Sequence, residues 1–365
     1  MTKGFIKNLL TLLLSSLITL FIAEFISRVF TPQDLSGSWA VMNEDGLKMN
    51  KSSGKSIHRY NNREALYNFD EFGTRKLLNI TPIDSQINSQ KILILGDSFS
   101  FGYLLNDKDT YVHKLNEHYK HKIFYNASAA GWGTLDYTSY FERYCSSIRP
   151  DITAIMLNSD DIGRLYKRLI EPKLYFVDEN MLSLKKKVYI PSTKDKLKKT
   201  INKIPGYSFL LENSNLIQLF RNVYIFGLKA FDKKNLYWQN STTPTFGIDD
   251  IGMELDKVLR YSYLTFEHLI QISKLCDTQL KVIYTGVQIK NNVGMYPTLE
   301  FIDDAVKKNF FKKKGIFFKD LTKTKEMIKY RSNLNSVTIK FDMHPNELGA
   351  DLIYKALKNY GIFNN

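Results

Sequence analysis

The 365-residue sequence has only two cysteines, Cys145 and Cys276, and they lie far apart in the chain. It contains no Cys-x-x-Cys pair and no cysteine–histidine cluster with metal-ligand spacing, so we predict no metal site and no bound cofactor. We interpret both cysteines as buried small apolar residues. A disulfide between them is compatible with the sequence but does not follow from it.

Acidic residues are in the minority, because 51 lysines and arginines outnumber 37 aspartates and glutamates and give a net charge of +14. The basic residues are scattered and accompany no nucleic-acid-binding motif, so we expect no nucleic-acid partner. Anionic lipid headgroups or acidic envelope glycans are simpler partners for this charge. Since 44% of the residues are hydrophobic, the chain can bury a large core and is not expected to be disordered.

One apolar segment without charges, Leu9–Ala23, lies close to the N-terminus behind Lys3 and Lys7. Apolar neighbours extend it to residues 5–26, which matches the roughly 20 residues that cross a bilayer. No small-x-small cleavage site follows, so we favour an uncleaved single-pass anchor over a secretory signal peptide. With the lysines inside, the positive-inside rule places the rest of the chain outside the membrane.

Beyond residue 90, apolar runs alternate with segments of helical period. This alternation predicts an α/β fold, namely a three-layer, doubly wound parallel sheet of about five strands. The predicted strands are Lys91–Leu95, Lys122–Asn126, Ile152–Leu157, Leu280–Tyr284 and Ile316–Phe318. The predicted helices are Thr110–Tyr119, Leu135–Ser147, Met253–Leu275 and a last helix from Asn346 to Leu357.

We divide the chain into a membrane anchor (1–30), a linker and strap (31–90) and the α/β domain (91–365). An insertion at about 164–252 contains a predicted hairpin at Lys173–Pro191, a lysine-rich stretch and an apolar helix-like run, Leu210–Phe231. Polar residues interrupt that run, so we do not expect a second membrane span. Either a lid over the substrate cleft or a packing element that holds the domain near the bilayer accounts for the insertion.

Gly96-Asp97-Ser98 directly follows the first predicted strand, and open α/β sheets bind ligands at the carboxyl ends of their strands. Asp342 and His344 are two residues apart, so in an extended segment their side chains share a face. Asp342 can then hold the imidazole in the tautomer that accepts a proton from Ser98. We predict Ser98 as nucleophile, His344 as base and Asp342 as the orienting carboxylate.

Four short blocks follow one another at predicted strand ends or before the last helix. They are Gly96-Asp97-Ser98-Phe99-Ser100-Phe101-Gly102, Asn126-Ala127-Ser128-Ala129-Ala130-Gly131-Trp132-Gly133, Leu157-Asn158-Ser159-Asp160-Asp161 and Asp342-Met343-His344-Pro345-Asn346. Their order resembles the SGNH/GDSL hydrolase family, and in particular membrane-anchored bacterial members related to glycan O-acetyl esterases and acetyltransferases. The resemblance implies an oxyanion hole formed by Ser98, Gly131 and position 160.

Position 160 departs from the family pattern, because this chain has Asp160 where the pattern has Asn. An ionised carboxylate repels a developing oxyanion, and a missing amide donor is worth about 3 kcal/mol. Three interpretations stay open: Asp160 is protonated, Asn158 donates instead, or the hole is weak. The last block also departs, since the family more often separates its Asp and His by two residues.

The segment Asn68–Arg75, ahead of the nucleophile, resembles the Asn…Gly-x-Arg segment of anchored SGNH-type proteins. Arg75 is either an anion contact beside the site or part of an ordered linker with Gly73 in a turn. The ordered linker is the simpler interpretation.

The predicted triad and the resemblance to the SGNH/GDSL family together imply an esterase. It would act through an acyl-serine on acyl esters, in particular acetyl esters, of cell-envelope glycans. Its catalytic domain would face outward from a bacterial inner membrane. If a sugar hydroxyl replaces water, the same triad makes an O-acetyltransferase of an envelope polysaccharide. A third alternative, motivated by Asp160, is an SGNH-like protein that binds glycan without catalysis.

Overall fold

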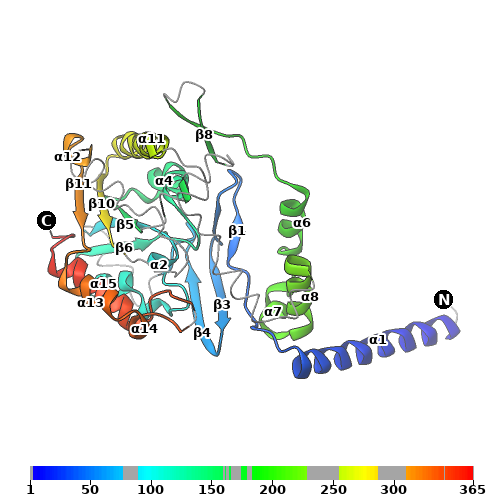
Figure 1. Ribbon diagram of the computed structural model, residues 1–365. Coiled ribbons are helices and arrows are strands. Elements are labelled where there is room, and N and C mark those ends of the chain that lie inside the picture. The colour runs from blue at the N-terminus through cyan, green and yellow to red at the C-terminus, as the bar shows by residue number, and fades with distance from the viewer. Residues whose placement is uncertain are drawn as a thin grey trace. The chain divides into compact units, whose positions relative to one another are not determined.

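Figure 1 shows the computed structural model of the chain, which describes residues 3–76, 89–158, 161, 164–165, 174–178, 183–227, 255–286, 310–340 and 342–364. These residues belong to two compact units. As far as the ranges are described, the first consists of Met1–Ser38, Ser56–Ala65 and Leu197–Thr243, and the second of Trp39–Lys55, Leu66–Lys196 and Pro244–Asn365.

A parallel five-stranded sheet forms the centre of the second unit. Its strands are β5 (Gln90–Leu95), β6 (Lys122–Asn126), β7 (Ile152–Leu157), β10 (Gln279–Tyr284) and β11 (Phe317–Asp320). They lie in the order β11-β10-β7-β5-β6, which is a doubly wound order of the flavodoxin-like kind. The direction of winding reverses between β5 and β7, and doubly wound sheets bind ligands at such a switch point.

Successive side chains of β5 point to opposite faces of the sheet, so a hydrophobic core forms on each side. Leu93 and Leu95 belong to one core, and Ile92 and Ile94 belong to the other. In the part of the chain that the structure describes, α4 (Thr134–Ile148) and α11 (Leu255–Leu275) cover the first face, and α3 (Tyr111–His118), α13 (Lys325–Ser332) and α15 (Glu347–Asn359) cover the second. The predicted α/β fold class is confirmed.

Helix starts follow from capping residues in the sequence. Thr110 accepts a hydrogen bond from the backbone N–H of His113 at the start of α3, and Asn346 accepts two from the first turn of α15. The last predicted strand, Ile316–Phe318, is shifted toward the C-terminus in the structure, where β11 runs from Phe317 to Asp320. Among the described residues, this unit also contains the short helices α2 (Ser98–Phe101), η1 (Asp107–Asp109, a 3-10 helix), α12 (Phe311–Lys313) and α14 (Leu334–Val337).

The two cysteines form a disulfide that joins the end of α4 to the turn after α11, with 6.0 Å between their Cα atoms. The interpretation of Cys145 and Cys276 as two separate apolar residues is therefore wrong, although Cys145 does lie in the hydrophobic core. The two helices pack on the same face of the sheet, which brings together residues 131 positions apart.

Short strands occupy the segment that we expected to be a linker. β1 (Ala40–Met42) pairs with β2 (Lys48–Asn50), and β3 (Gly54–Tyr60) pairs with β4 (Arg63–Phe69). In the insertion, β8 (Tyr175–Val177) and β9 (Leu184–Lys186) form the predicted antiparallel hairpin, as far as it is described.

Arg75, which follows β4, is buried with 3% of its surface exposed. Its guanidinium donates to the carboxylate of Asp107 at 2.7 Å and to the carbonyls of Phe101, Gly102 and Leu105 at 2.8–2.9 Å. Because these acceptors take up the guanidinium, Arg75 is not an anion contact. It holds the end of α2, and Gly73 lies in a turn with φ of +75°, as the ordered-linker interpretation predicted.

The first unit begins with α1 (Lys3–Phe30), a 28-residue helix that is long and apolar enough to cross a membrane. The unit also contains α7 (Tyr207–Asn213) and α8 (Asn215–Phe226), and α6 (Thr193–Ile201) leads into it. The predicted single run Leu210–Phe231 is thus broken at Ser214, which caps α8 by accepting a hydrogen bond from Ile217. Residues 228–231 lie outside the described residues.

Candidate active site

The turn after β5 positions Ser98. Asp97 is the N-cap of α2 and accepts a hydrogen bond from the backbone N–H of Phe99 at 2.9 Å. Ser98 is the first residue of the helix, so its own N–H has no acceptor within the helix. The turn requires glycine at position 96, because a Cβ there would lie 2.6 Å from the Cβ of Ser100. Ser98 is 6% exposed at the carboxyl end of the sheet.

The three residues of the predicted triad come together. The imidazole Nε2 of His344 lies 2.7 Å from the hydroxyl oxygen of Ser98, and its Nδ1 is hydrogen-bonded to the carboxylate of Asp342. An imidazole whose Nδ1 donates to a carboxylate presents Nε2 as an acceptor. The arrangement can therefore remove the proton of Ser98.

The loop that carries Asp342 and His344 is not extended, and the geometry expected from the sequence is wrong at this point. Met343 lies between them in the left-handed region with φ of +68°, and the backbone N–H groups of Asp342 and Met343 both donate to the carbonyl of Ile339. This turn folds the carboxylate back onto the imidazole. A non-glycine residue at positive φ is unusual and often occurs at functional sites.

Two aromatic rings flank the imidazole of His344. The ring centroid of Tyr103 lies 4.5 Å away and that of Phe99 lies 5.0 Å away. Both come from α2 or the turn that follows it, so the helix that begins at Ser98 also restrains the imidazole of His344.

A buried polar network lies beside Ser98, at the switch point. Asn158, which follows β7, donates from Nδ2 to the carboxylate of Asp97 at 2.8 Å and accepts from the hydroxyl of Thr285. Its backbone N–H donates to the carboxylate of Asp161 at 2.7 Å. The side-chain amide that we considered as an alternative oxyanion donor is therefore engaged by Asp97.

Arg164 connects this network to the loop of the second motif. Its guanidinium donates to Asp97 at 3.2 Å and to the backbone carbonyl of Trp132 at 2.6 Å. Trp132 follows Gly131, which has a left-handed backbone with φ of +76°. Arg164 thus ties the loop that carries the predicted donor Gly131 to Asp97, the residue that precedes Ser98.

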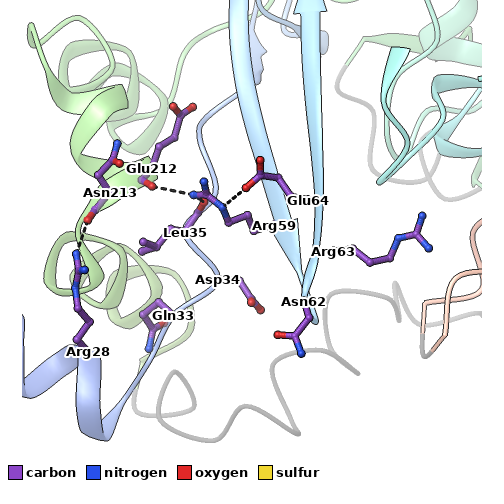
Figure 2. Close-up of a pocket in the computed structure, with 10 residues that line it drawn as sticks. All are labelled: Arg28, Gln33, Asp34, Leu35, Arg59, Asn62, Arg63, Glu64, Glu212 and Asn213. Atoms are coloured by element: carbon purple, nitrogen blue, oxygen red, sulfur yellow. Dashed lines mark hydrogen bonds and ion pairs between the residues drawn. The ribbon is translucent and has the colours of Figure 1, made fainter. Parts of the chain in front are cut away.

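Asp160 lies outside the described residues. Among the residues that the structure describes, no group of three or more His, Cys, Asp or Glu side chains is placed to hold a metal ion. A cavity of about 400 Å³ belongs to the first unit and is lined by none of the triad residues (Figure 2).

No family model and no curated protein matches the sequence. The similar solved structures include a member of the lipolytic protein G-D-S-L family from Veillonella parvula, with 13% identity over 75% of this chain and 100% of that one, at a TM-score of 0.40. They also include the esterase EstA from a Pseudoalteromonas species (13% identity, 76% and 100% coverage, TM-score 0.39) and the acetyl-xylooligosaccharide esterase Axe2 from Geobacillus (15%, 76% and 96%, 0.39). Similarity at this level carries no function over to this chain.

Proposed function

We propose that the protein is a serine esterase of the SGNH/GDSL type in which Ser98, His344 and Asp342 are the catalytic triad. The observation that carries the proposal is the 2.7 Å separation of Ser98 Oγ and His344 Nε2, with Asp342 hydrogen-bonded to the other ring nitrogen. The chain brings Ser98 and His344 together from positions 246 residues apart. They meet at the carboxyl ends of the strands, where α/β folds bind ligands.

In the first half of the reaction, His344 Nε2 takes the proton of Ser98 as the serine oxygen attacks the ester carbonyl. The backbone N–H groups of Ser98 and Gly131 stabilise the negative charge on the carbonyl oxygen. The ester C–O bond then breaks, His344 returns the proton to the leaving alcohol, and an acyl-serine remains. In the second half, water attacks the acyl-serine with His344 again as base, which releases the acid and restores Ser98.

The substrate class that we propose is acyl esters, in particular acetyl esters, of cell-envelope glycans, on the outer side of a bacterial inner membrane. Two features support this location. Helix α1 is apolar enough to span a bilayer with Lys3 and Lys7 on the inner side. The disulfide between Cys145 and Cys276 is typical of proteins that fold in an oxidising compartment outside the cytosol.

The test is turnover of p-nitrophenyl acetate by the purified full-length protein in detergent. We expect Ser98→Ala to lower the rate by at least about 10³-fold, because removing a nucleophile disables the whole triad. Ser100→Ala, which removes a neighbouring buried hydroxyl of α2, is the matched control and should retain activity. Equal background rates for the wild type and Ser98→Ala would contradict an esterase and favour the glycan-binding alternative.

Hydrolase and transferase share the first half-reaction and differ in the acceptor that resolves the acyl-serine. Intact-protein mass spectrometry after treatment with an acyl donor separates them. An esterase loses the acyl group in water alone. Persistence of the acyl-serine until an oligosaccharide is added would contradict hydrolysis and indicate an O-acetyltransferase.

A further inference from the structure

Helix α8 is attached to the C-terminal end of α1 by an unusual carboxylate. Glu24 lies within the apolar helix, where an uncompensated charge is costly in a bilayer. It accepts hydrogen bonds from the hydroxyl of Ser214 and from the backbone N–H groups of Asn215 and Leu216, at 2.7–3.0 Å. Glu24 therefore caps the N-terminus of α8 and fixes that helix to α1.

The inward face of α8 is polar. Asn215 and Gln218 are 5% and 4% exposed, and Asn215 accepts a hydrogen bond from the backbone N–H of Gln33 at 2.7 Å. One turn beyond Gln218 on the same face, Asn222 donates to the side chain of Gln33 at 2.8 Å. These contacts hold α8 beside the residues that leave α1.

The outward face of α8 is aromatic. Phe220 and Tyr224, four residues apart and thus on one face, are 61% and 60% exposed. At 100° per residue they point opposite to the face of Asn215, Gln218 and Asn222. A helix that buries amides and exposes aromatic rings is inverted relative to a surface helix in water. This polarity is the one expected of a helix whose outer face contacts lipid.

Two arginines lie near the C-terminal end of α1 in the first unit. Arg28 and Arg59 line the cavity shown in Figure 2 and donate to the backbone carbonyls of Asn213 and Glu212. Arg28 is also paired with Glu24, and Arg59 with Glu64. Internal ion pairs thus hold the lining of the cavity. Arg28 lies in the last turn of α1, and we expect the lipid headgroups to begin at this turn.

We propose that the Phe220–Tyr224 face of α8 docks onto the outer leaflet of the same bilayer that α1 crosses. The occupant of this face is then the boundary between headgroups and acyl chains, where aromatic side chains concentrate. Basic residues that precede α8 complement anionic headgroups. They are the exposed lysines Lys198, Lys199 and Lys203. The inference rests on the membrane anchoring in the proposed function and is independent of catalysis.

The test places an environment-sensitive NBD fluorophore on single cysteines of the full-length protein in nanodiscs of phosphatidylethanolamine and phosphatidylglycerol. Both native cysteines are in the disulfide, so only the introduced thiol reacts. The test sites are Phe220→Cys and Tyr224→Cys. Leu14→Cys, on the exposed surface of α1, reports the anchor, and Ile328→Cys, 50% exposed on α13 of the second unit, is the aqueous control.

We expect blue-shifted emission at positions 220 and 224, with a larger loss of fluorescence to nitroxide-labelled lipids than to iodide, and the reverse at position 328. Iodide-sensitive emission at 220 and 224 while position 14 is lipid-quenched would overturn the docking and leave the anchor intact. Blue-shifted emission that neither quencher reaches would mean that protein covers the face, which also overturns it. Lipid quenching at 220 and 224 with an aqueous position 14 would support docking and contradict the anchor.

Discussion

The side-chain amide of Asn158 donates a hydrogen bond to Asp97, with 2.8 Å between Nδ2 and the carboxylate Oδ1. The two residues follow the adjacent strands β7 and β5, so this bond joins the two sides of the switch point of the sheet beside Ser98. Asp97 also caps α2 and accepts a hydrogen bond from Arg164. Its carboxylate therefore accepts hydrogen bonds from Phe99, Asn158 and Arg164.

If the proposed esterase activity holds, Arg164→Ala should lower its kcat about 10- to 100-fold, because hydrogen bonds of a charged group are worth roughly 1.5–3 kcal/mol and these hold the Gly131–Trp132 loop. Steady-state kinetics with p-nitrophenyl acetate measures the effect. Arg164→Lys keeps the charge but not the planar fork and should recover only part of the rate. An Ala variant with unchanged kcat would contradict the role of Arg164 in positioning the loop.

Asp342→Asn should lower kcat on the order of 10³- to 10⁴-fold, because an amide no longer fixes the imidazole in the tautomer that accepts the proton of Ser98. Asp151→Asn, an exposed site at the opposite end of β7, is the matched control and should behave like the wild type. Near-normal turnover by Asp342→Asn would show that His344 needs no orienting carboxylate.

Reduction of the disulfide should lower the free energy of unfolding by about 2–4 kcal/mol, since it releases a loop of 131 residues in the unfolded chain. Urea denaturation with and without reductant measures the loss, and the double variant Cys145→Ser/Cys276→Ser should match the reduced protein. Two thiols that react in the unreduced, denatured protein would contradict the bond.

Arg75→Ala should destabilise the second unit by about 3–5 kcal/mol, because it leaves the buried carboxylate of Asp107 without its cation. Thermal unfolding followed by circular dichroism is the measurement. Lys76→Ala changes the next residue, which is exposed, and should shift the unfolding temperature little. A comparable small shift for Arg75→Ala would exclude its structural role.

Asp351 joins α15 to α3 through Lys114 at 3.0 Å and pairs with Lys355 at 2.7 Å. Burial alone would raise its pKa, but the hydrogen bonds from Lys355 and Lys114 lower the pKa below the usual 3.8. A carboxyl group with a lowered folded-state pKa contributes stability above the unfolded-state pKa and loses it as the pH falls through the folded-state value.

Asp351→Asn should therefore destabilise the protein by about 0.5–1 kcal/mol at neutral pH, a small effect because the group is partly exposed. Urea titrations at a series of pH values test this. The difference from the wild type should stay constant down to about pH 5 and shrink below pH 4. A stability difference that grows on acidification would contradict a lowered pKa of Asp351 in the folded state.

The inner strands β5, β7 and β10 were predictable because they are mostly buried and appear as continuous apolar runs. The β3–β4 hairpin was missed because the buried positions of β3 are occupied by Ser56 and His58, which hides the alternation. Asn61 and Asn62 both have positive φ and form the kind of two-residue turn that joins hairpin strands. That pair was a usable signal.

The meeting of Ser98, His344 and Asp342 was predictable from the sequence, whereas the geometry of the loop that carries the last two was not. Spacing alone suggested an extended Asp342–His344 segment, and only the backbone shows the left-handed turn at Met343. Arg164 gave no signal, because its partners Asp97 and Trp132 are 67 and 32 positions away and meet it only through the order of the strands.

The most direct measurement is peptide mapping by mass spectrometry after treatment of the full-length protein with a fluorophosphonate, which reacts with activated serines. We predict a single phosphonylated residue, Ser98, and loss of the adduct in His344→Ala. Labelling of Ser98 that is equally fast in His344→Ala, or no labelling of Ser98 in the wild-type protein, would contradict a triad at this site.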